Sequence, residues 1–420
     1  MYPIRFNEEA APKARSESRY VVSSDKYKLG KYYTPQDVID FILATCIKRK
    51  SDKVLDPSCG PGGFLIRAFS RLAFLNRSDA KIDLSGQIWG VDLDSKSVAL
   101  ARENLSEVLK VRRKNSIHVL HRDFFDVQSP SRKQATLGTW CEKDRVSIVD
   151  AVVGNPPYTR QEELALPPFG NKYKDKLREV ISQDYPYLKI SKMAGIYAYF
   201  LIHAASFLPR DGARLGFVTL RSWIDTRYGA DLQRFLLKHF KILFIIESDV
   251  EKWFTDAQML PCIVVAETCN NAEHRNSNLV KFVRLKQPLS AYWSPKSNNE
   301  EEHWQKTDNF ALSLENAEDA FDFSEVSFLG KKLRVHESSS IRIVMIQQRF
   351  LIEDIKWGKY LVAPMVFFKI LERANVLLTP LSEVATVYRG VTTGANNFFL
   401  FPNKFFGMKE KGGYLVLLHM

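Results

Sequence analysis

Residues 155–158, Asn-Pro-Pro-Tyr, combine groups that could hold and activate an amino group. The side-chain oxygen of Asn155 and the carbonyl of Pro156 can each accept one N–H, and the prolines fix φ at about −65°. Two acceptors placed in this way would aim the lone pair of a planar amino nitrogen at an electrophile, mostly in the transition state. The Tyr158 ring, rather than its hydroxyl, would attract the nitrogen as it becomes positive. The alternative is a proline turn with a packing tyrosine.

A glycine-rich loop, "DPSCGPGGF" at 56–64, lies between a short apolar run and an amphipathic run. Its glycines let the backbone pass close to a ligand, and the helix that follows offers its positive N-terminus. An ordinary glycine turn is the alternative. The lysine of a phosphate-binding P-loop is missing, and Asp56 would be a poor neighbour for a pyrophosphate. A cofactor that carries adenosine and a positive charge fits the loop better than a dinucleotide.

Two further acidic residues follow at the ends of apolar runs. Asp92 closes "GVD" about thirty residues after the glycine loop, at the place of a carboxylate that accepts both hydroxyls of a ribose. Asp123 and Phe124 follow "IHVLHR", where a carboxylate could accept from an adenine amino group and a ring could cover its face. Three such positions in chain order predict a nucleoside-binding cleft.

Alternating strands and helices would position these residues. Strands are predicted at 53–59, 86–94, 117–126, 146–158, 213–223, 241–248, 260–268 and 278–285. Helices are predicted at 38–47, 60–74, 95–109, 197–208 and 228–240. This alternation indicates an α/β fold with a doubly wound, mostly parallel sheet, which binds ligands at the carboxyl ends of its strands.

Helix starts and loops are indicated by local signals. Thr34-Pro35 is predicted as the N-cap and first turn of one helix, and Ser95 as the N-cap of another. The polar stretches 269–278 and 294–304 are rich in Asn, Ser and charge and are predicted as loops.

The composition is that of a soluble globular protein, with 45% apolar and 26% charged residues among 420. The net charge of +12 favours a polyanionic partner. The five cysteines have no CxxC spacing, which argues against disulfides and a zinc site and suits a reducing cytoplasm. No signal peptide is visible, and the apolar run 196–208 is predicted as a buried helix rather than a membrane span. We therefore expect no metal and no membrane partner.

The motifs together, with "YYTP" at 32–35, resemble the gamma-class, adenine-specific DNA methyltransferases of bacterial restriction–modification systems. The resemblance covers roughly residues 28–285 and implies the class I methyltransferase fold and the cofactor S-adenosylmethionine. The positions it implies for cofactor binding are Thr34, Asp56, Pro57, Cys59, Gly60, Asp92, Asp123, Phe124 and Asn155. Those for catalysis are Asn155, Pro156 and Tyr158, and those for the target base are Pro157, Tyr158 and Phe254.

Double-stranded DNA is the partner that the resemblance implies, and a cognate restriction or specificity subunit could accompany it. Adenine in a duplex must be flipped out before its amino group can react. The segment 160–192 mixes basic residues with tyrosines, which suits a DNA-clasping loop, although a solvated charged loop is the alternative. The enzyme would act in the cytoplasm, at the nucleoid through its DNA.

We predict a flexible arm at 1–27, a methyltransferase domain at 28–290, a connecting region at 291–375 and the start of an incomplete target-recognition domain at 376–420. The short C-terminal part makes independent recognition of a DNA sequence doubtful. Two other functions remain open. One is methylation of an amino group in RNA or of a protein glutamine, and the other is a non-catalytic, DNA-binding subunit with a methyltransferase fold.

Overall fold

The computed structural model describes residues 34–77, 84–109, 117–129, 146–159, 170, 172–191, 193–253, 260–293, 299–328, 330–352, 356–374 and 381–386. The chain divides into two compact units, Met1–Glu372 and Arg373–Met420. In the second unit, the described residues include the one-turn helix α14 (Leu381–Val384). All of the other elements below belong to the first unit, except that the last residue of α13, Arg373, is the first residue of the second unit.

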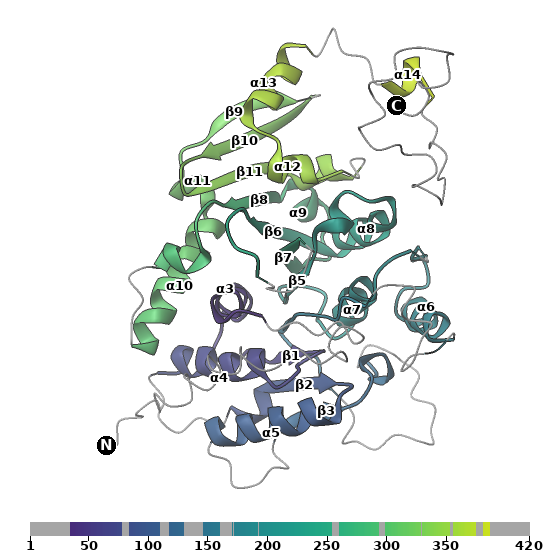
Figure 1. Ribbon diagram of the computed structural model, residues 1–420, viewed down its shortest axis with the longest axis vertical. Coiled ribbons are helices and arrows are strands. Elements are labelled where there is room, and N and C mark those ends of the chain that lie inside the picture. The colour runs from purple at the N-terminus through teal and green to yellow at the C-terminus, as the bar shows by residue number, and fades with distance from the viewer. Residues whose placement is uncertain are drawn as a thin grey trace, which may run out of the picture. The chain divides into compact units, whose positions relative to one another are not determined.

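A single mixed sheet forms the centre of the first unit (Figure 1). Its described strands are β1 (Val54–Asp56), β2 (Ile88–Asp92), β3 (His118–His121), β4 (Ala151–Gly154), β5 (Arg214–Leu220), β6 (Phe240–Ser248), β7 (Pro261–Thr268), β8 (Leu279–Leu285), β9 (Ser324–Phe328), β10 (Lys331–Glu337) and β11 (Ile341–Gln347). They lie in the order β3-β2-β1-β4-β5-β7-β6-β8-β11-β10-β9.

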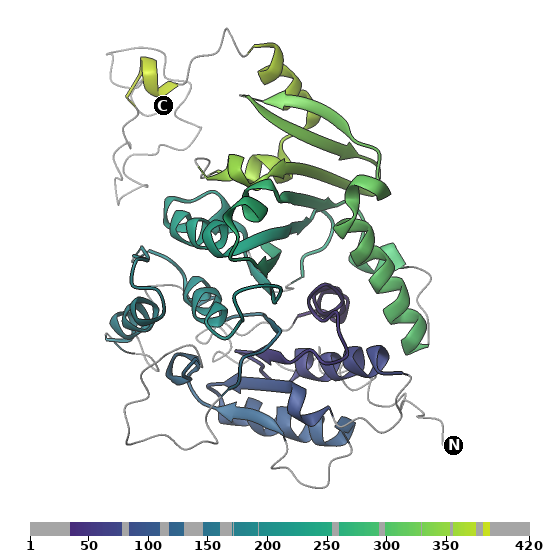
Figure 2. The same ribbon diagram turned by 180° about the vertical axis from the view of Figure 1, so that it is seen from behind.

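The strand directions confirm the predicted doubly wound α/β class. Strands β3, β2, β1, β4 and β5 all pair in parallel, whereas β7 is antiparallel to both β5 and β6. Strand β8 is parallel to β6, and β11, β10 and β9 then add antiparallel strands at the end of the sheet farthest from β3 (Figure 2). The chain runs outward from β1 to β3 and then returns to β4 on the other side of β1. Ligands bind at such a switch point in α/β sheets.

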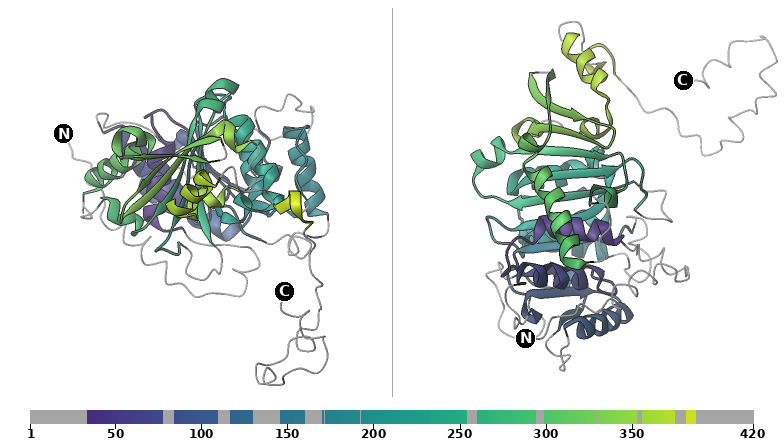
Figure 3. Two further views of the ribbon diagram at one scale, coloured as in Figure 1. Left: turned by 90° about the horizontal axis from the view of Figure 1, so that it is seen from above. Right: turned by 90° about the vertical axis from the view of Figure 1, so that its left-hand side faces the viewer.

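Helices cover both sides of the sheet. Their described bounds are α3 (Gln36–Cys46), α4 (Gly63–Leu75), α5 (Ser95–Leu109), α6 (Tyr173–Asp184), α7 (Ile196–Ala205), α8 (Ala230–His239), α9 (Ala272–Ser277), α10 (Glu300–Glu315), α11 (Ala317–Ala320), α12 (Gly358–Val362) and α13 (Met365–Arg373). Helices α3, α4, α5 and α10 form one group of contacting helices, and α6, α7, α8 and α9 form another. The two groups lie on opposite sides of the sheet (Figure 3).

The apolar run predicted as a buried helix is α7, and all of its residues are buried. Its burial on all sides explains why it lacks an amphipathic pattern. Among the described helices, none has both the length and the apolar character that crossing a membrane would require.

Two helix starts differ from the prediction. Helix α3 begins at Gln36 with Pro35 as its N-cap residue, one position later than predicted, and no side chain caps it. Helix α5 begins at Ser95 itself, because the Asp94 carboxylate accepts from the backbone of Ser97 at 3.4 Å and from its hydroxyl at 2.8 Å. An aspartate reaches free N–H groups as well as a serine does, so the sequence pattern allowed either residue.

Of the two polar stretches predicted as loops, the first contains the helix α9 and the second contains the beginning of α10. Asn271 caps α9, and Asn299 caps α10 by accepting from the backbone N–H of Glu301 at 2.9 Å. Polar composition misled the prediction because only one stripe of α10 is buried, including Trp304 and Phe310. The region 291–375, predicted as a connector, contributes α10 and three strands of the same sheet, and the compact unit extends to Glu372.

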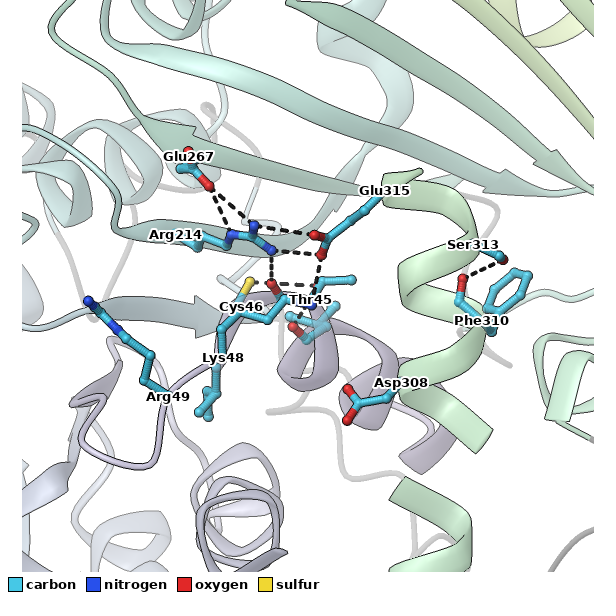
Figure 4. A network of polar contacts seen from close by, with 12 residues as sticks. Thr45, Cys46, Lys48, Arg49, Arg214, Glu267, Asp308, Phe310, Ser313 and Glu315 are labelled. Atoms are coloured by element: carbon cyan, nitrogen blue, oxygen red, sulfur yellow. Dashed lines mark hydrogen bonds and ion pairs between the residues drawn. The ribbon is translucent and has the colours of Figure 1, made fainter. Parts of the chain in front are cut away.

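Ion pairs fasten α10 to β5 and to Lys48, which follows α3 (Figure 4). The Arg214 guanidinium of β5 donates to Glu315 of α10 at 2.8 Å and to the carbonyl of Thr45 at 2.5 Å, and it also pairs with Glu267 at 3.2 Å. Lys48 meets the same Glu315 carboxylate at 2.8 Å. The C-terminal end of α10 is therefore held against both α3 and β5.

Candidate active site

The glycine loop connects β1 to α4 through two residues in left-handed conformation. Gly60 has φ +51° and Gly62 has φ +95°, a region that residues with a Cβ atom rarely adopt. A Cβ on Gly60 would meet nothing within 4 Å, so the backbone borders open space there. The backbone N–H of Gly60 donates to the Asp92 carboxylate at 2.8 Å, and that of Cys59 donates to the Val91 carbonyl at 2.9 Å. The loop is thus fixed to the end of β2.

Asp92 ends β2 with its carboxylate already oriented. One oxygen accepts from Gly60, and the other accepts from the backbone N–H of Asp94 at 2.8 Å. A carboxylate offers about four lone-pair positions, so about two remain for further donors. This geometry suits the predicted binding of two ribose hydroxyls.

Asp56, the last residue of β1, is a buried carboxylate with 1% exposure. It accepts from the backbone N–H of Ser58 at 3.0 Å, and no cation in the described part of the chain forms an ion pair with it. Burial raises the pKa of Asp56 to about 8, and the Asp92 carboxylate adds to this rise while the Ser58 hydrogen bond opposes it. A Cβ on Gly154 would lie 2.8 Å from the Asp56 carboxylate, so glycine is needed there. The site favours a ligand that brings its own positive charge.

Asn155 follows β4 directly and lies beside the glycine loop. The Ser58 hydroxyl donates to the backbone carbonyl of Asn155 at 3.2 Å, which joins the loop after β1 to the clamp after β4. Asn155 and Pro157 are half-buried, and Pro156 is buried. The adjacent parallel strands β1 and β4 thus bring Asp56 and Asn155 together, as their predicted places at strand ends required.

Tyr158 has a polar role that the sequence did not indicate. Its hydroxyl donates to the side-chain oxygen of Asn155 and lies 3.0 Å from the carbonyl of Val218 on β5. The residue is only 5% exposed, so its ring is largely covered rather than open to a ligand. The hydroxyl therefore holds the acceptor oxygen of Asn155 against the central strand β5. Base stacking by the Tyr158 ring stays a prediction.

Asp123 and Phe124 lie after β3, at the start of the short 3-10 helix η4 (Phe124–Asp126). Asp123 caps this helix by accepting from the backbone N–H of Phe125 at 3.1 Å. Phe124 is only 2% exposed, and its ring packs 5.4 Å from that of Phe200 and 4.7 Å from that of His203. Phe124 is thus a core residue here, and its predicted contact with adenine stays a prediction.

The remaining predicted positions are placed less specifically. Thr34 is half-buried just before α3, Pro57 and Cys59 are buried in the glycine loop, and Phe254 lies outside the described residues. Trp253, its neighbour, is 4% exposed and belongs to the core.

Helix α6 contributes residues that sequence reasoning did not assign to the site. It lies within the segment 160–192 predicted as a loop, and its Lys176 pairs with Asp123 and Asp126 at 2.8 Å each. Tyr173 and Lys176 are three residues apart and share one helix face. Their spacing was visible in the sequence, but nothing in it indicated Asp123 as their partner.

Two other kinds of site can be compared with this one. Among the residues that the structure describes, no group of three or more His, Cys, Asp or Glu could hold a metal ion. A cavity of about 320 Å³ lies against α10 and η9 (Leu289–Trp293), not at the strand ends where the predicted residues gather. We favour the strand ends, because the charged and hydrogen-bonding groups converge there.

Comparison with known proteins supports the same interpretation. The chain is 29% identical over 266 residues to the type II methyltransferase M.BstVI of Geobacillus stearothermophilus, which covers 60% of this chain and 44% of that protein. It is 24% identical over 237 residues to the type II methyltransferase M.BanIII of Aneurinibacillus aneurinilyticus, covering 54% of this chain and 37% of that protein. The chain thus spans less than half the length of these relatives.

The fold is similar to that of the type IIG restriction endonuclease BpuSI, with a TM-score of 0.52 and 14% identity over 78% of this chain and 32% of that one. With the strand order above, the first unit has the predicted class I methyltransferase fold. The model of the N-6 DNA Methylase family matches residues 19–219, a range that contains the glycine loop, the acidic strand ends and the Asn-Pro-Pro-Tyr clamp. Over residues 19–219 the chain is therefore similar to the N-6 DNA Methylase family.

Proposed function

We propose that this chain transfers a methyl group from S-adenosylmethionine to the N6 amino group of adenine in double-stranded DNA. The observation that carries the proposal is the junction between Ser58 and Asn155, because it fixes an amino-group clamp to a cofactor loop. The clamp follows β4 and the loop follows β1, at the switch point of the sheet. The similarity of residues 19–219 to the N-6 DNA Methylase family supports the same chemistry.

The residues at the strand ends fit the cofactor. Asp92 would accept the ribose hydroxyls with its remaining lone pairs, and the open backbone at Gly60 would let the ligand approach closely. Asp56 would face the cationic part of the cofactor, which supplies an electrophilic methyl group on a positively charged sulfur. Thr34, Pro57 and Cys59 would line the same end of the site.

The clamp would act on the amino nitrogen of adenine. Asn155 Oδ1 and the Pro156 carbonyl would accept its two N–H groups, so that the lone pair leaves conjugation with the ring and points at the methyl carbon. The cofactor would supply the methyl group through cleavage of its S–C bond, and the clamp would hold the nitrogen that gains the N–C bond and gives up one proton to water. The Tyr158 hydroxyl would keep Asn155 Oδ1 in position during this step. No residue of the clamp needs to act as a base before attack.

DNA binding would involve two lysines at the start of α6, its N-cap residue Lys172 and Lys174 in its first turn. Lys172 is exposed and Lys174 half-buried, and neither forms an ion pair within the described part of the chain. Lys176 is different, because two carboxylates already neutralise it. A duplex adenine would have to be flipped out to reach Asn155. We also propose that a target-recognition domain starts at residue 376. A separate specificity or restriction subunit would be its partner in recognising the DNA sequence.

The direct test is incubation with labelled S-adenosylmethionine and separate pools of DNA, RNA and protein. We expect label in DNA, recovered as N6-methyladenine after digestion to nucleosides. Label only in RNA or in glutamine would support the alternative amino-group methyltransferases. Tight DNA binding without label in any pool would support a non-catalytic subunit.

Cofactor binding should depend on pH through Asp56. Its pKa of about 8 means that the carboxyl is mostly protonated at neutral pH in the free protein. A cationic ligand favours the carboxylate, so S-adenosylmethionine should bind more tightly as the pH rises toward 8 and should release a proton. S-adenosylhomocysteine lacks the sulfonium charge and should gain less. Calorimetry in buffers of different ionisation enthalpy measures the released proton.

The matched variant Asp56→Asn should remove the proton release and most of the pH dependence. Stability gives a second check, because an unfolded aspartate ionises at about 3.9. The raised pKa favours the folded protein at low pH, so the ligand-free protein should lose stability as the pH rises from about 4 to 8. A ratio of S-adenosylmethionine to S-adenosylhomocysteine affinity that is constant with pH would contradict this role.

The salt dependence of DNA affinity should report the phosphate contacts of α6. Replacing Lys172 and Lys174 with alanine should flatten the plot of log affinity against log salt by about 0.9 for each lysine–phosphate pair that the substitutions remove. Filter binding or anisotropy with one duplex at several salt concentrations measures the slope. Lys306→Ala on α10, which removes a cation paired with Glu302 at 2.7 Å, is the control and should leave the slope unchanged. An unchanged slope in the double variant would assign these two lysines to the solvated surface.

A further inference from the structure

The Asp123 carboxylate is held by donors from two different elements. Its Oδ1 accepts from the backbone N–H of Phe125 at 3.1 Å and from the Tyr173 hydroxyl at 3.2 Å, and its Oδ2 accepts from Lys176 Nζ at 2.8 Å. Three of about four lone-pair positions are therefore used. The last position is left with a fixed direction, because the other three hold the carboxylate from both sides.

The two side chains from α6 are suited to this task. Burial and the neighbouring Asp123 carboxylate raise the pKa of Tyr173, so its hydroxyl keeps the proton that it donates. Lys176 also bridges to Asp126 at 2.8 Å, and its contacts with the two carboxylates raise its pKa against the effect of burial. Its ammonium lies 5.5 Å from the centre of the Tyr173 ring, so the two donors also contact each other.

The other end of α6 is fixed to the same region. Asp184, its last residue, meets Nδ1 of His203 at 2.6 Å, and Nε2 of His203 lies 3.2 Å from the carbonyl of Val127. Both side chains of this pair are almost fully buried. The His203 ring packs 4.7 Å from that of Phe124. Helix α6 is therefore attached at its first turn to Asp123 and at its last residue to His203, which packs against Phe124.

We propose that Lys176 and Tyr173 are positioning residues for Asp123, so that recognition of the cofactor's adenine amino group depends on α6. This inference rests on the proposed function, in which Asp123 accepts that amino group. A carboxylate only accepts hydrogen bonds, so a fixed carboxylate selects an amino group and rejects a carbonyl at the same ring position. Lys176 thus belongs to cofactor selection and not to the DNA-phosphate contacts of its neighbours.

The test compares S-adenosylhomocysteine, which carries an amino group at that ring position, with S-inosylhomocysteine, which carries a carbonyl there and a hydrogen on the adjacent ring nitrogen N1. The wild-type protein should bind the adenosyl ligand at least about tenfold more tightly, because the inosyl carbonyl would face the acceptor Asp123. Calorimetry on the full chain measures both affinities without DNA and without turnover.

Lys176→Met keeps the aliphatic stem and removes the ammonium. It should weaken S-adenosylhomocysteine binding about tenfold and reduce the preference over the inosyl ligand about fivefold. Lys176→Arg keeps the charge and should restore most of both. Arg178→Met is the matched control, because Arg178 is an exposed cation on the same helix whose ion-pair partner is Asp175, at 3.7 Å, within the described part of the chain. It should leave both affinities unchanged.

Each outcome has a defined meaning. A preference in Lys176→Met equal to that of the wild type would overturn the inference and leave the proposed function standing. A wild-type protein that binds neither ligand would overturn both. If Lys176→Met unfolds, which thermal denaturation would show, Tyr173→Phe provides the second measurement, since it removes one donor to Asp123 and keeps the ring. It should reduce the preference about threefold, and no reduction would overturn the inference.

Discussion

Replacing Asn155 with alanine is expected to slow methyl transfer to DNA at least about a hundredfold, the usual effect of losing one preorganised hydrogen-bonding group in a transition state. The side chain supplies one of two acceptors for the target amino group, and the Pro156 carbonyl alone cannot orient the lone pair. Single-turnover transfer of labelled methyl to a duplex measures this step. Substrate positioning should be less affected than the rate, because the neighbouring prolines keep the backbone in place.

Asp92→Ala separates the clamp from the cofactor site. The Asp92 carboxylate is fixed by two backbone donors and is proposed to accept ribose hydroxyls, so its loss should weaken S-adenosylmethionine binding at least about tenfold. Asn155→Ala should bind the cofactor nearly as the wild type does. Equal weakening of cofactor binding in both variants would contradict the division of roles between the ends of β2 and β4.

The sequence predicted the centre of the fold well because its signals are local. The strands that end at Asp56, Asp92 and Gly154 are short apolar runs followed by polar residues, and parallel strands place such ends at one edge. In the structure, the loop after β1 contacts Asp92, and Ser58 donates to the backbone carbonyl of Asn155. A doubly wound, mostly parallel sheet could be predicted there because short connections in α/β folds follow few paths.

The parts that were missed depend on contacts between distant residues. Helix α10 begins in a polar stretch that looks like a loop, and its burial depends on partners such as Arg71, which meets Asp308 at 2.7 Å. Strands β9 to β11 extend the sheet beyond β8, because β11 pairs antiparallel with β8, β10 with β11 and β9 with β10. No local signal reveals these partners. The attachment of Lys176 to Asp123 joins residues 53 positions apart. Local patterns carry no information about such partners.

The hydrogen bonds of the Tyr158 hydroxyl also depend on distant residues. They change the effect that we expect from removing this hydroxyl. Sequence reasoning assigned the ring to stacking and gave the hydroxyl no role. In the structure the hydroxyl connects Asn155 Oδ1 to the carbonyl of Val218, so it fixes the acceptor that the reaction needs. The sequence shows that residue 158 carries an aromatic ring and a hydroxyl. The hydrogen-bond partners of that hydroxyl, however, depend on how β4 and β5 pair.

Tyr158→Phe should therefore lower the single-turnover rate about five- to tenfold, since a hydrogen bond contributes about 0.5–1.5 kcal/mol. Its affinity for DNA and cofactor should stay close to that of the wild type, because the ring remains. Tyr158→Ala should lose several kcal/mol in activity, since base–aromatic stacking is worth about 1–3 kcal/mol per base and Asn155 is freed as well. Tyr158 as a residue is only 5% exposed, so removal of its ring should cost about 3–5 kcal/mol of folding stability, and thermal denaturation must accompany the kinetics. Full activity in Tyr158→Phe would show that the hydroxyl does not position Asn155. A folded Tyr158→Ala protein as active as Tyr158→Phe would show that the ring does not contact the target base.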